Sequence, residues 1–266
     1  MAHIRLSGLG LDVPLFVQRD VATVGWAHVF KRAALSRPAR RWVTLLEDID
    51  LEVNDGDRIA IIGRNGAGKS TLLQVLTGAY RPTRGTISIE GTRQALINIS
   101  LGFHPEATVL ENILLRCSSM GVRLDTVRGQ VPSILEFAEL QAKASHRLKT
   151  LSSGQRMRLG FSISTAFQRD IMIMDEWLST GDAEFLGRAR ERMSDRVGGS
   201  RIVVMATHSI QMARLVCNRG ILLEDGKIKA AGSVSRVINV YKERNKRLKD
   251  AGGGAPLAVE QGVVNG

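Results

Sequence analysis

The residues from Gly63 to Ser70, GRNGAGKS, have the types and the spacing of a loop that binds phosphate groups. The loop fits the pattern G-x-x-x-x-G-K-[ST], and it lies between a strand-like run, RIAIIG, and a helix-like run, KSTLLQVLTG. Its glycines let backbone N–H groups turn toward phosphate oxygens, and the helix adds the positive end of its dipole. We therefore expect nucleotide binding by Gly63, Arg64, Asn65, Gly66, Ala67, Gly68, Lys69, Ser70 and Thr71.

Three of these side chains have predicted roles toward a nucleoside triphosphate. Lys69 would bring its positive charge to the β- and γ-phosphates, and Ser70 would give its hydroxyl to Mg²⁺. Thr71 would bond the α-phosphate. The loop alone does not distinguish a GTPase, a kinase and a transport ATPase, because proteins of all three kinds share it.

Three further groups could complete such a site. The apolar run DIMIMDE ends in Asp175 and Glu176, and paired acids at the end of a strand suggest metal and general-base chemistry. The pentapeptide LSSGQ reads as a helix N-terminus with Ser152 or Ser153 as its cap, and taken alone it needs no other explanation. His208 directly follows the strand-like RIVVMAT, where a lone histidine is more often structural.

The elements that must position these groups alternate between strand-like and helix-like runs, which predicts an α/β core with a parallel sheet. Residues 109–167 are largely helical in pattern, with breaks expected at Gly121, Pro132 and 152–154. We expect buried strands at 58–63, 170–175 and 201–207, and a strand at TISIEG. Gly78 is expected to cap a helix, and residues 220–232 to form a hairpin that turns at Asp225-Gly226. A basic helix over 235–249 and a disordered tail complete the expected elements.

The order of the motifs resembles the ATP-binding cassette family, over about Leu45 to Gly232. The resemblance implies an ABC-type P-loop NTPase fold: a parallel sheet core, an antiparallel β subdomain and a helical subdomain at about 107–168. It places the ATP-binding domain at 1–250 and a flexible tail at 251–266. It also implies an ATPase with ATP and Mg²⁺ as cofactors.

The same resemblance assigns roles to single residues. Asp175 corresponds to the acid that holds Mg²⁺, Glu176 to the base that polarises the attacking water, and His208 to the residue that senses the γ-phosphate. Asp182 lies in STGD, which corresponds to a loop that crosses a dimer interface. The signature loop corresponds to Ser152, Ser153, Gly154 and Gln155, and in the family it closes over the γ-phosphate bound to the other subunit. The resemblance therefore implies a homodimer that holds two nucleotides.

Trp177, where most cassettes have proline, points to one branch of this family. DEWLSTGD, LSSGQ and GFHPEATVLENI together resemble the ATPases of exporters of O-antigen, capsule or teichoic acid. This branch implies two copies of a separate integral membrane permease, a lipid-linked glycan as cargo and a peripheral place on the cytoplasmic face of the bacterial inner membrane. Trp177 would orient the loop after the acids, or it simply fills the core.

Three other functions remain open at this point. An exporter ATPase of the ABC-2 type for a drug or a lipid would share most of the motifs. A soluble cassette ATPase acting on nucleic acid or the ribosome would suit the basic charge, although such proteins usually have two cassettes or coiled-coil arms. A regulator that binds nucleotide without hydrolysis is disfavoured by the complete set of Lys69, Asp175, Glu176 and His208.

Two family features lack a clear counterpart. No glutamine lies between Gln94 and Gln130, where the family has one that links Mg²⁺ to the permease, so His104, Glu106 or water is expected to replace it. For the aromatic that stacks on adenine the candidate is Trp42, with Trp26 and Phe30 as alternatives.

Composition sets wider bounds. Of 266 residues, 44% are hydrophobic and 24% are charged, as in an ordinary globular protein, and the net charge of +11 favours anionic partners or reflects an unspecific basic surface. We expect no nucleic acid partner. Cys117 and Cys217 are expected to be buried free thiols. No signal peptide is apparent, and no apolar run approaches the roughly 20 residues of a membrane span. The basic segment 21–42 is either a solvated surface or a contact surface for a membrane partner or anionic head groups.

Overall fold

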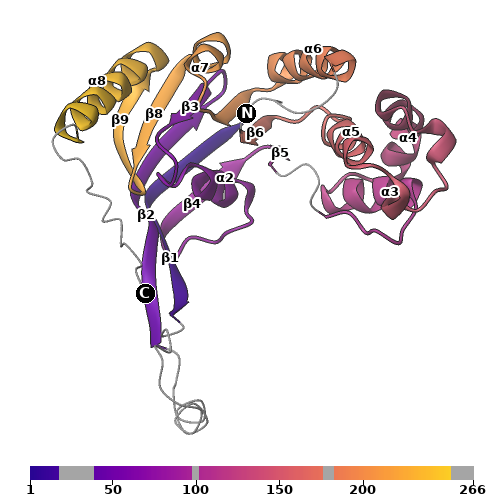
Figure 1. Cartoon of the computed structure of the whole chain (residues 1–266), viewed down its shortest axis with the longest axis horizontal. Coiled ribbons are helices and arrows are strands. Elements are labelled where there is room, and N and C mark those ends of the chain that lie inside the picture. The colour runs from indigo at the N-terminus through magenta and orange to yellow at the C-terminus, as the bar shows by residue number, and fades with distance from the viewer. Residues whose placement is uncertain (18–38, 98–101, 176–182, 253–266) are drawn as a thin grey trace, which may run out of the picture.

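The computed structural model describes residues 1–17, 39–97, 102–175 and 183–252 (Figure 1). Several predictions concern residues outside these ranges: the roles of Glu176, Trp177 and Asp182, the adenine contacts of Trp26 and Phe30, most of the basic segment 21–42, and residues 253–266 of the tail. Residues 251 and 252, which were assigned to the tail, belong to the last helix.

A six-stranded sheet forms the centre of the molecule, and five of its strands are parallel. Its order is β5 (Arg93–Leu96), β6 (Ile171–Asp175), β7 (Ile202–Ala206), β3 (Arg58–Ile62), β8 (Arg219–Glu224) and β9 (Lys227–Ser233), with β9 antiparallel to β8. β6 and β7 are buried on both faces, which explains why their sequences are continuous apolar runs. The predicted parallel core and its buried strands are confirmed.

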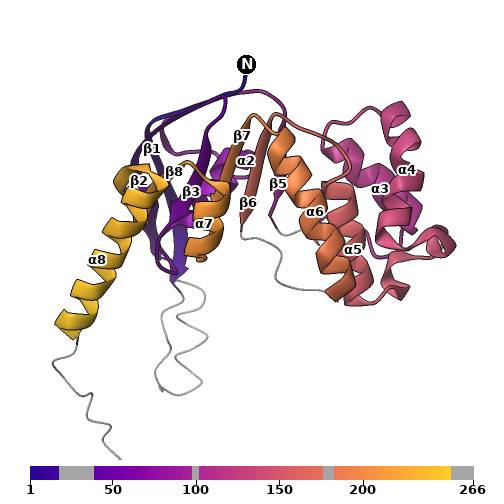
Figure 2. The ribbon, with the colours of Figure 1, turned by 90° about the horizontal axis from the view of Figure 1, so that it is seen from above.

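The two faces of this sheet are covered by different layers (Figures 1 and 2). Ile59 and Ile173 pack into a core shared with α2 (Lys69–Thr77) and with an antiparallel sheet of β2 (Ala39–Asn54), β1 (His3–Val17) and β4 (Arg84–Glu90). Ala60 and Met172, their neighbours along the strands, face the opposite way, as strand geometry requires. They pack toward α6 (Ala183–Gly199), α7 (Ile210–Val216) and α8 (Val234–Gly252).

A helical part with its own core lies at the β5 side of the sheet (Figures 1 and 2). It contains α3 (Val109–Ser119), α4 (Leu124–Ala138) and α5 (Ser153–Ser164), with short 3₁₀ turns at Gln141–Lys143 and Leu148–Thr150. The breaks predicted near Gly121 and at 152–154 are confirmed. The break predicted at Pro132 is wrong, because α4 continues through it. A proline inside a helix costs about 3 kcal/mol, and burial of Ile134, Leu135 and Ala138 beyond it offsets that cost.

Other local predictions are confirmed. Gly78 caps α2 with a φ of 84°, and Asp225 and Gly226 turn the β8–β9 hairpin with φ of 47° and 72°. Cys117 and Cys217 are buried free thiols.

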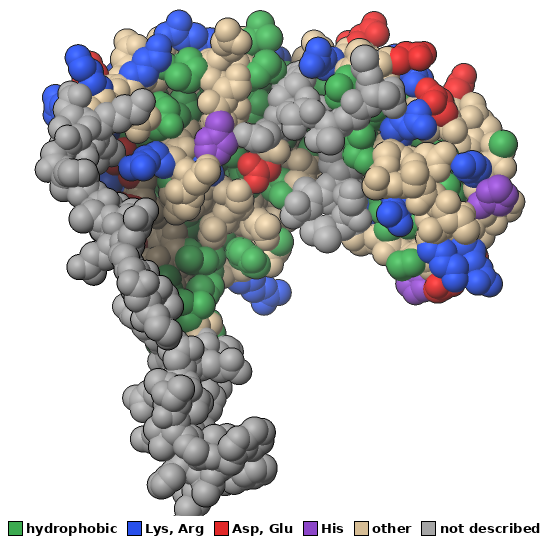
Figure 3. All heavy atoms as spheres, viewed as in Figure 1, with side chains coloured by type: hydrophobic (Ala, Val, Ile, Leu, Met, Phe, Trp, Pro, Cys, Tyr) green, Lys and Arg blue, Asp and Glu red, His purple; other side chains and the backbone are tan. Residues whose placement is uncertain are grey.

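Among the described helices, none is long and apolar enough to cross a membrane. Figure 3 shows lysine and arginine side chains both over α8 and over the helical part, so positive charge is spread across this face.

Candidate functional site

The loop between β3 and α2 depends on glycine at three positions. Gly66 and Gly68 have φ of 80° and 99°, a region that L side chains rarely adopt. At Gly63 a Cβ atom would lie 2.3 Å from the carbonyl oxygen of Leu223, so the close approach of β8 excludes any larger residue. The backbone of the loop can therefore turn its N–H groups toward a ligand.

Lys69, the first residue of α2, is folded back over this loop. Its Nζ donates hydrogen bonds to the carbonyl oxygens of Gly63 at 2.9 Å and Arg64 at 3.0 Å, and the residue is only 7% exposed. The first turn of α2 holds no acidic residue, so the positive end of the helix dipole is not neutralised there. The ammonium group and the helix end together favour an anion at this place.

Ser70 and Asp175 meet although 105 residues separate them in the sequence. The Ser70 hydroxyl donates a 2.7 Å hydrogen bond to Oδ2 of Asp175, which ends β6. A hydroxyl and a single carboxylate are a donor set suited to Mg²⁺, which keeps several waters and takes its remaining ligands from substrate phosphates. The residues present therefore fit this ion together with a nucleotide.

A cavity of about 960 Å³ opens over these groups. His208, exposed after β7, also lines it, so the structure brings together the predicted loop, the acid and the histidine. The lining consists of Val43, Thr44, Leu45, Asn65, Gly66, Gly68, Lys69, Ser70, Thr71, Asp175, His208, Asp225 and Gly226. Among the predicted loop residues, Gly63, Arg64 and Ala67 do not line it.

Two walls of this cavity come from segments outside the predicted motifs. One is the edge of β2 at Val43 to Leu45, and the other is the β8–β9 turn at Asp225 and Gly226. The Gly226 N–H donates to the carbonyl oxygen of Ala67 at 3.1 Å, and its own carbonyl accepts from the Glu47 N–H at 2.9 Å. The Asp-Gly dipeptide was a visible signal for the turn, but nothing local shows that the turn contacts the loop.

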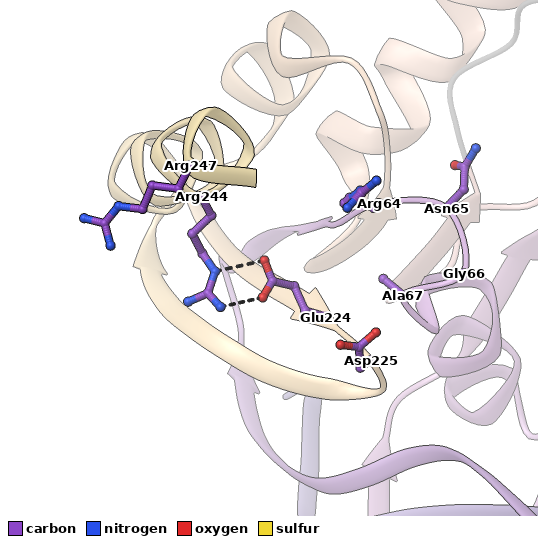
Figure 4. Close-up of a pocket in the computed structure, with 8 residues that line it drawn as sticks. All are labelled: Arg64, Asn65, Gly66, Ala67, Glu224, Asp225, Arg244 and Arg247. Atoms are coloured by element: carbon purple, nitrogen blue, oxygen red, sulfur yellow. Dashed lines mark hydrogen bonds and ion pairs between the residues drawn. The ribbon is translucent and has the colours of Figure 1, made fainter. Parts of the chain in front are cut away.

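A second hollow, of about 550 Å³, lies between the loop, the end of β8 and α8 (Figure 4). It is bounded by Arg64, by Arg247 and by an ion pair between Arg244 and Glu224 at 2.8 Å. Lys69, Ser70 and Asp175 do not line it. The groups suited to phosphate and Mg²⁺ are therefore in the larger cavity.

The predicted signature residues form the exposed N-terminus of α5. Ser152 is its N-cap: the Ser152 hydroxyl accepts from the Gln155 N–H at 3.2 Å, and the Gln155 side chain accepts from the Ser152 N–H at 3.1 Å. Ser152, Ser153 and Gly154 are exposed, and none of the four residues lines the 960 Å³ cavity. Within one chain, the structure does not bring the signature residues to the loop.

Among the described candidates for the two missing family features, Trp42, His104 and Glu106 do not line the cavity. Trp42 is 62% exposed, and the cavity wall begins at the next residue, Val43. The Glu106 carboxylate forms ion pairs with Lys149 at 3.0 Å and Arg147 at 3.3 Å, and the Lys149 contact holds the pKa of Glu106 below its usual value. The His104 backbone is held by Asn112, which accepts from its N–H at 2.8 Å.

Comparison with known proteins agrees with this geometry. Residues 46–179 match the family model of the ABC transporter. The chain is 34% identical over 213 residues to the O-antigen export system ATP-binding protein RfbB of Klebsiella pneumoniae, covering 80% of this chain and 86% of that protein. It is also 34% identical to the teichoic acids export ATP-binding protein TagH of Bacillus anthracis, over 76% of this chain and 37% of the relative.

A solved structure shows the same fold. A dimeric ATP-binding cassette in a post-hydrolysis state with ADP and Pi superposes with a TM-score of 0.62, at 20% identity, over 87% of this chain and 98% of that one. The fold and the site define a P-loop nucleotide-binding domain. The chain belongs to the ABC transporter family, and it carries the ATPase domain of that family.

Proposed function

We propose that this chain is the ATP-hydrolysing subunit of an exporter that moves a lipid-linked polysaccharide through a separate membrane permease. The proposal of a polysaccharide cargo is supported by the similarity, over most of the chain, to ATP-binding proteins named for O-antigen and teichoic acid export. Two copies of the chain would act on the cytoplasmic face of the membrane with two copies of the permease. The groove of this chain that receives the permease would lie in the helical part, at about 107–148.

Binding of ATP rests on the loop and Lys69. In this proposal the loop N–H groups and the start of α2 surround the phosphates. Lys69 exchanges its bonds to two carbonyl oxygens for bonds to the β- and γ-phosphates. Thr71 bonds the α-phosphate, and the adenine stacks on an aromatic side chain, for which Trp42 remains the candidate. Ser70 and Asp175 would together hold Mg²⁺. When bound, the ion would offset the negative charge of the phosphate groups.

Hydrolysis requires a proton acceptor and an orienting group. Glu176 would accept a proton from the attacking water, and His208, on the cavity wall, would contact the γ-phosphate. Ser152 to Gln155 lie outside the cavity of their own chain, so they would reach the γ-phosphate of the second copy. Asp182 would lie in the loop that crosses between the copies. ATP binding would close this dimer, and hydrolysis would reopen it.

We also propose the division into domains given by the family resemblance: an ATP-binding domain over 1–250, with the helical subdomain inserted at about 107–168, and a tail over 251–266.

The ATPase is tested on purified protein. Lys69→Ala is expected to abolish tight ATP binding, and Glu176→Gln to retain binding while turnover falls by at least about 100-fold. Lys229→Ala, at an exposed lysine of β9, is the matched control and should leave both unchanged. Full turnover in Glu176→Gln would contradict the proposed role of that residue.

The cargo is tested in the native cell with Lys69→Ala at the chromosomal locus. Lipid-linked glycan trapped in membrane extracts, with none on the cell surface, is the expected result. An unchanged surface without trapped glycan would refute polysaccharide export, and the chain would then be a cassette ATPase of another exporter.

A further inference from the structure

Glu139 lies where three helices of the molecule meet. It is the C-cap of α4, and its φ of 58° is one of few positive values at a described residue other than glycine. Its carboxylate forms ion pairs with two arginines on different helices: Oε2 accepts from Arg158 on α5, and Oε1 accepts from Arg188 on α6. One side chain therefore joins the helical part to a helix that packs on the central sheet.

An aromatic cluster lies beside this ion pair network. Phe137 of α4, Phe161 of α5 and Phe185 of α6 have ring centroids 5.7 to 5.9 Å apart, and Phe161 and Phe185 are fully buried. Each ring comes from a different helix, so the cluster fixes how closely the helices approach. The cluster does not by itself fix their rotation, because tilted and edge-to-face rings tolerate small shifts.

Among the described residues, three arginines lie close to these rings. Arg188 lies 5.6 Å from the Phe137 ring and Arg192 only 4.1 Å from it, while Arg158 lies 6.0 Å from Phe185. Nη1 of Arg192 is buried and has no hydrogen-bond partner among the described residues. Glu139 is the carboxylate that pairs with both Arg158 and Arg188, so its negative charge offsets the repulsion between the guanidinium groups of two helices.

The two helices that Glu139 joins begin at functional segments. α5 begins at the predicted signature residues, and α6 begins at Ala183, directly after the segment that contains Glu176 and Asp182. The placement of α5 against α6 therefore sets the distance between the N-terminus of α5 and Ala183, where α6 begins. In the proposed dimer both must be positioned at once, because both act at the surface between the copies.

We propose that Glu139 is a positioning residue for ATP hydrolysis, which holds the signature helix α5 in register with α6 through Arg158 and Arg188. This inference rests on the proposed ATPase function. It does not depend on the cargo. The nucleotide cavity contains none of the three residues, so the effect is on turnover and not on the first binding of ATP.

The test uses the purified full chain, once its turnover has been shown to be lost in Glu176→Gln. Glu139→Gln removes the charge with little change of shape. We expect the maximal turnover rate to fall roughly 3- to 30-fold, while the affinity of the protein for ATP stays within about twofold. Glu139→Arg combined with Arg188→Glu keeps one acid and two arginines in the network, and it should restore much of the turnover.

Glu52→Gln is the matched control. Glu52 also pairs with two basic side chains, Arg5 at 2.9 Å and His3 at 3.3 Å, but it does so within the antiparallel sheet. This variant should keep wild-type turnover. Unchanged turnover in Glu139→Gln would overturn the proposal. So would a parallel loss of turnover, ATP affinity and thermal stability that the charge-reversed double variant does not restore, since that pattern describes a purely structural role.

Discussion

At the scale of single residues, Asp175 offers a test of the predicted metal site. Asp175→Asn keeps an oxygen that can accept the bond from Ser70, but it removes the negative charge beside a divalent cation. The Mg²⁺ concentration for half-maximal ATP turnover should rise by about tenfold or more, which corresponds to ~1.4 kcal/mol of lost binding. Titration of the ATP turnover rate with Mg²⁺ measures this half-maximal concentration. Binding of ATP without Mg²⁺ is the control and should not change, whereas an unaltered Mg²⁺ titration would contradict the role.

The two cysteines give a second prediction at this scale. Burial raises the pKa of Cys117 to about 11 and that of Cys217 to about 12, from an ordinary value of 9.0. Because burial favours the neutral thiol, the contribution of these groups to the free energy of unfolding is fully present below pH 9.0. That contribution is lost as the pH rises toward 11 to 12, where the folded protein would have to bury a thiolate. At about pH 8, below these values, the native protein should not react with a maleimide, while the chain in guanidinium chloride should react at both thiols. Rapid labelling of the native protein would contradict their burial.

At the scale of elements, the β8–β9 turn is expected to stabilise both the fold and the nucleotide cavity. In Gly226→Ala, a φ of 72° is strained, and the new Cβ would lie 2.5 Å from the Leu45 carbonyl oxygen. We expect a loss of about 2 kcal/mol in unfolding free energy, together with weaker ATP binding.

Gly56→Ala is the matched control for that turn. Gly56 has a similar φ of 87°, but a Cβ atom added there would meet no described residue within 4 Å apart from its chain neighbours. The two variants therefore share the backbone strain, and only Gly226→Ala adds a steric clash. It should cost about 1 kcal/mol and leave ATP binding unchanged. Equal losses in the two variants, measured by denaturant unfolding, would show that the contact with Leu45 is unimportant.

At the scale of the whole molecule, activity should require two copies of the chain. The signature residues lie outside the cavity of their own chain, so a complete site would combine the loop of one copy with α5 of the other. ATP turnover per chain should therefore fall on dilution. Mixing Lys69→Ala with Gly154→Asp, each inactive alone, should recover up to about a quarter of wild-type turnover, because a mixed dimer has one intact site. No recovery, together with turnover independent of concentration, would contradict the shared site.

The sequence predicted the features that local pattern determines. Gly66 and Gly68 were visible as loop glycines, Gly78 as a helix cap, and the run ending at Asp175 as a buried strand. The misses have a common cause, which is contact between distant segments. No local pattern shows that Gly226 bonds Ala67, far earlier in the chain, or that Glu139 meets Arg188. The prediction that Pro132 breaks the helix is wrong, because buried residues of α4 on both sides of it contribute more free energy than the proline costs.

The order of strands in the central sheet has a consequence for synthesis of the protein on the ribosome. β3 pairs with β7 on one side and β8 on the other, so the strand before the phosphate-binding loop gains its neighbours only after about three quarters of the chain has been made. The turn at 225–226 closes the cavity later still. A nascent chain stalled before this turn should not bind ATP, although its loop, Lys69 and Ser70 were translated long before. ATP would therefore stabilise only chains whose synthesis is nearly complete.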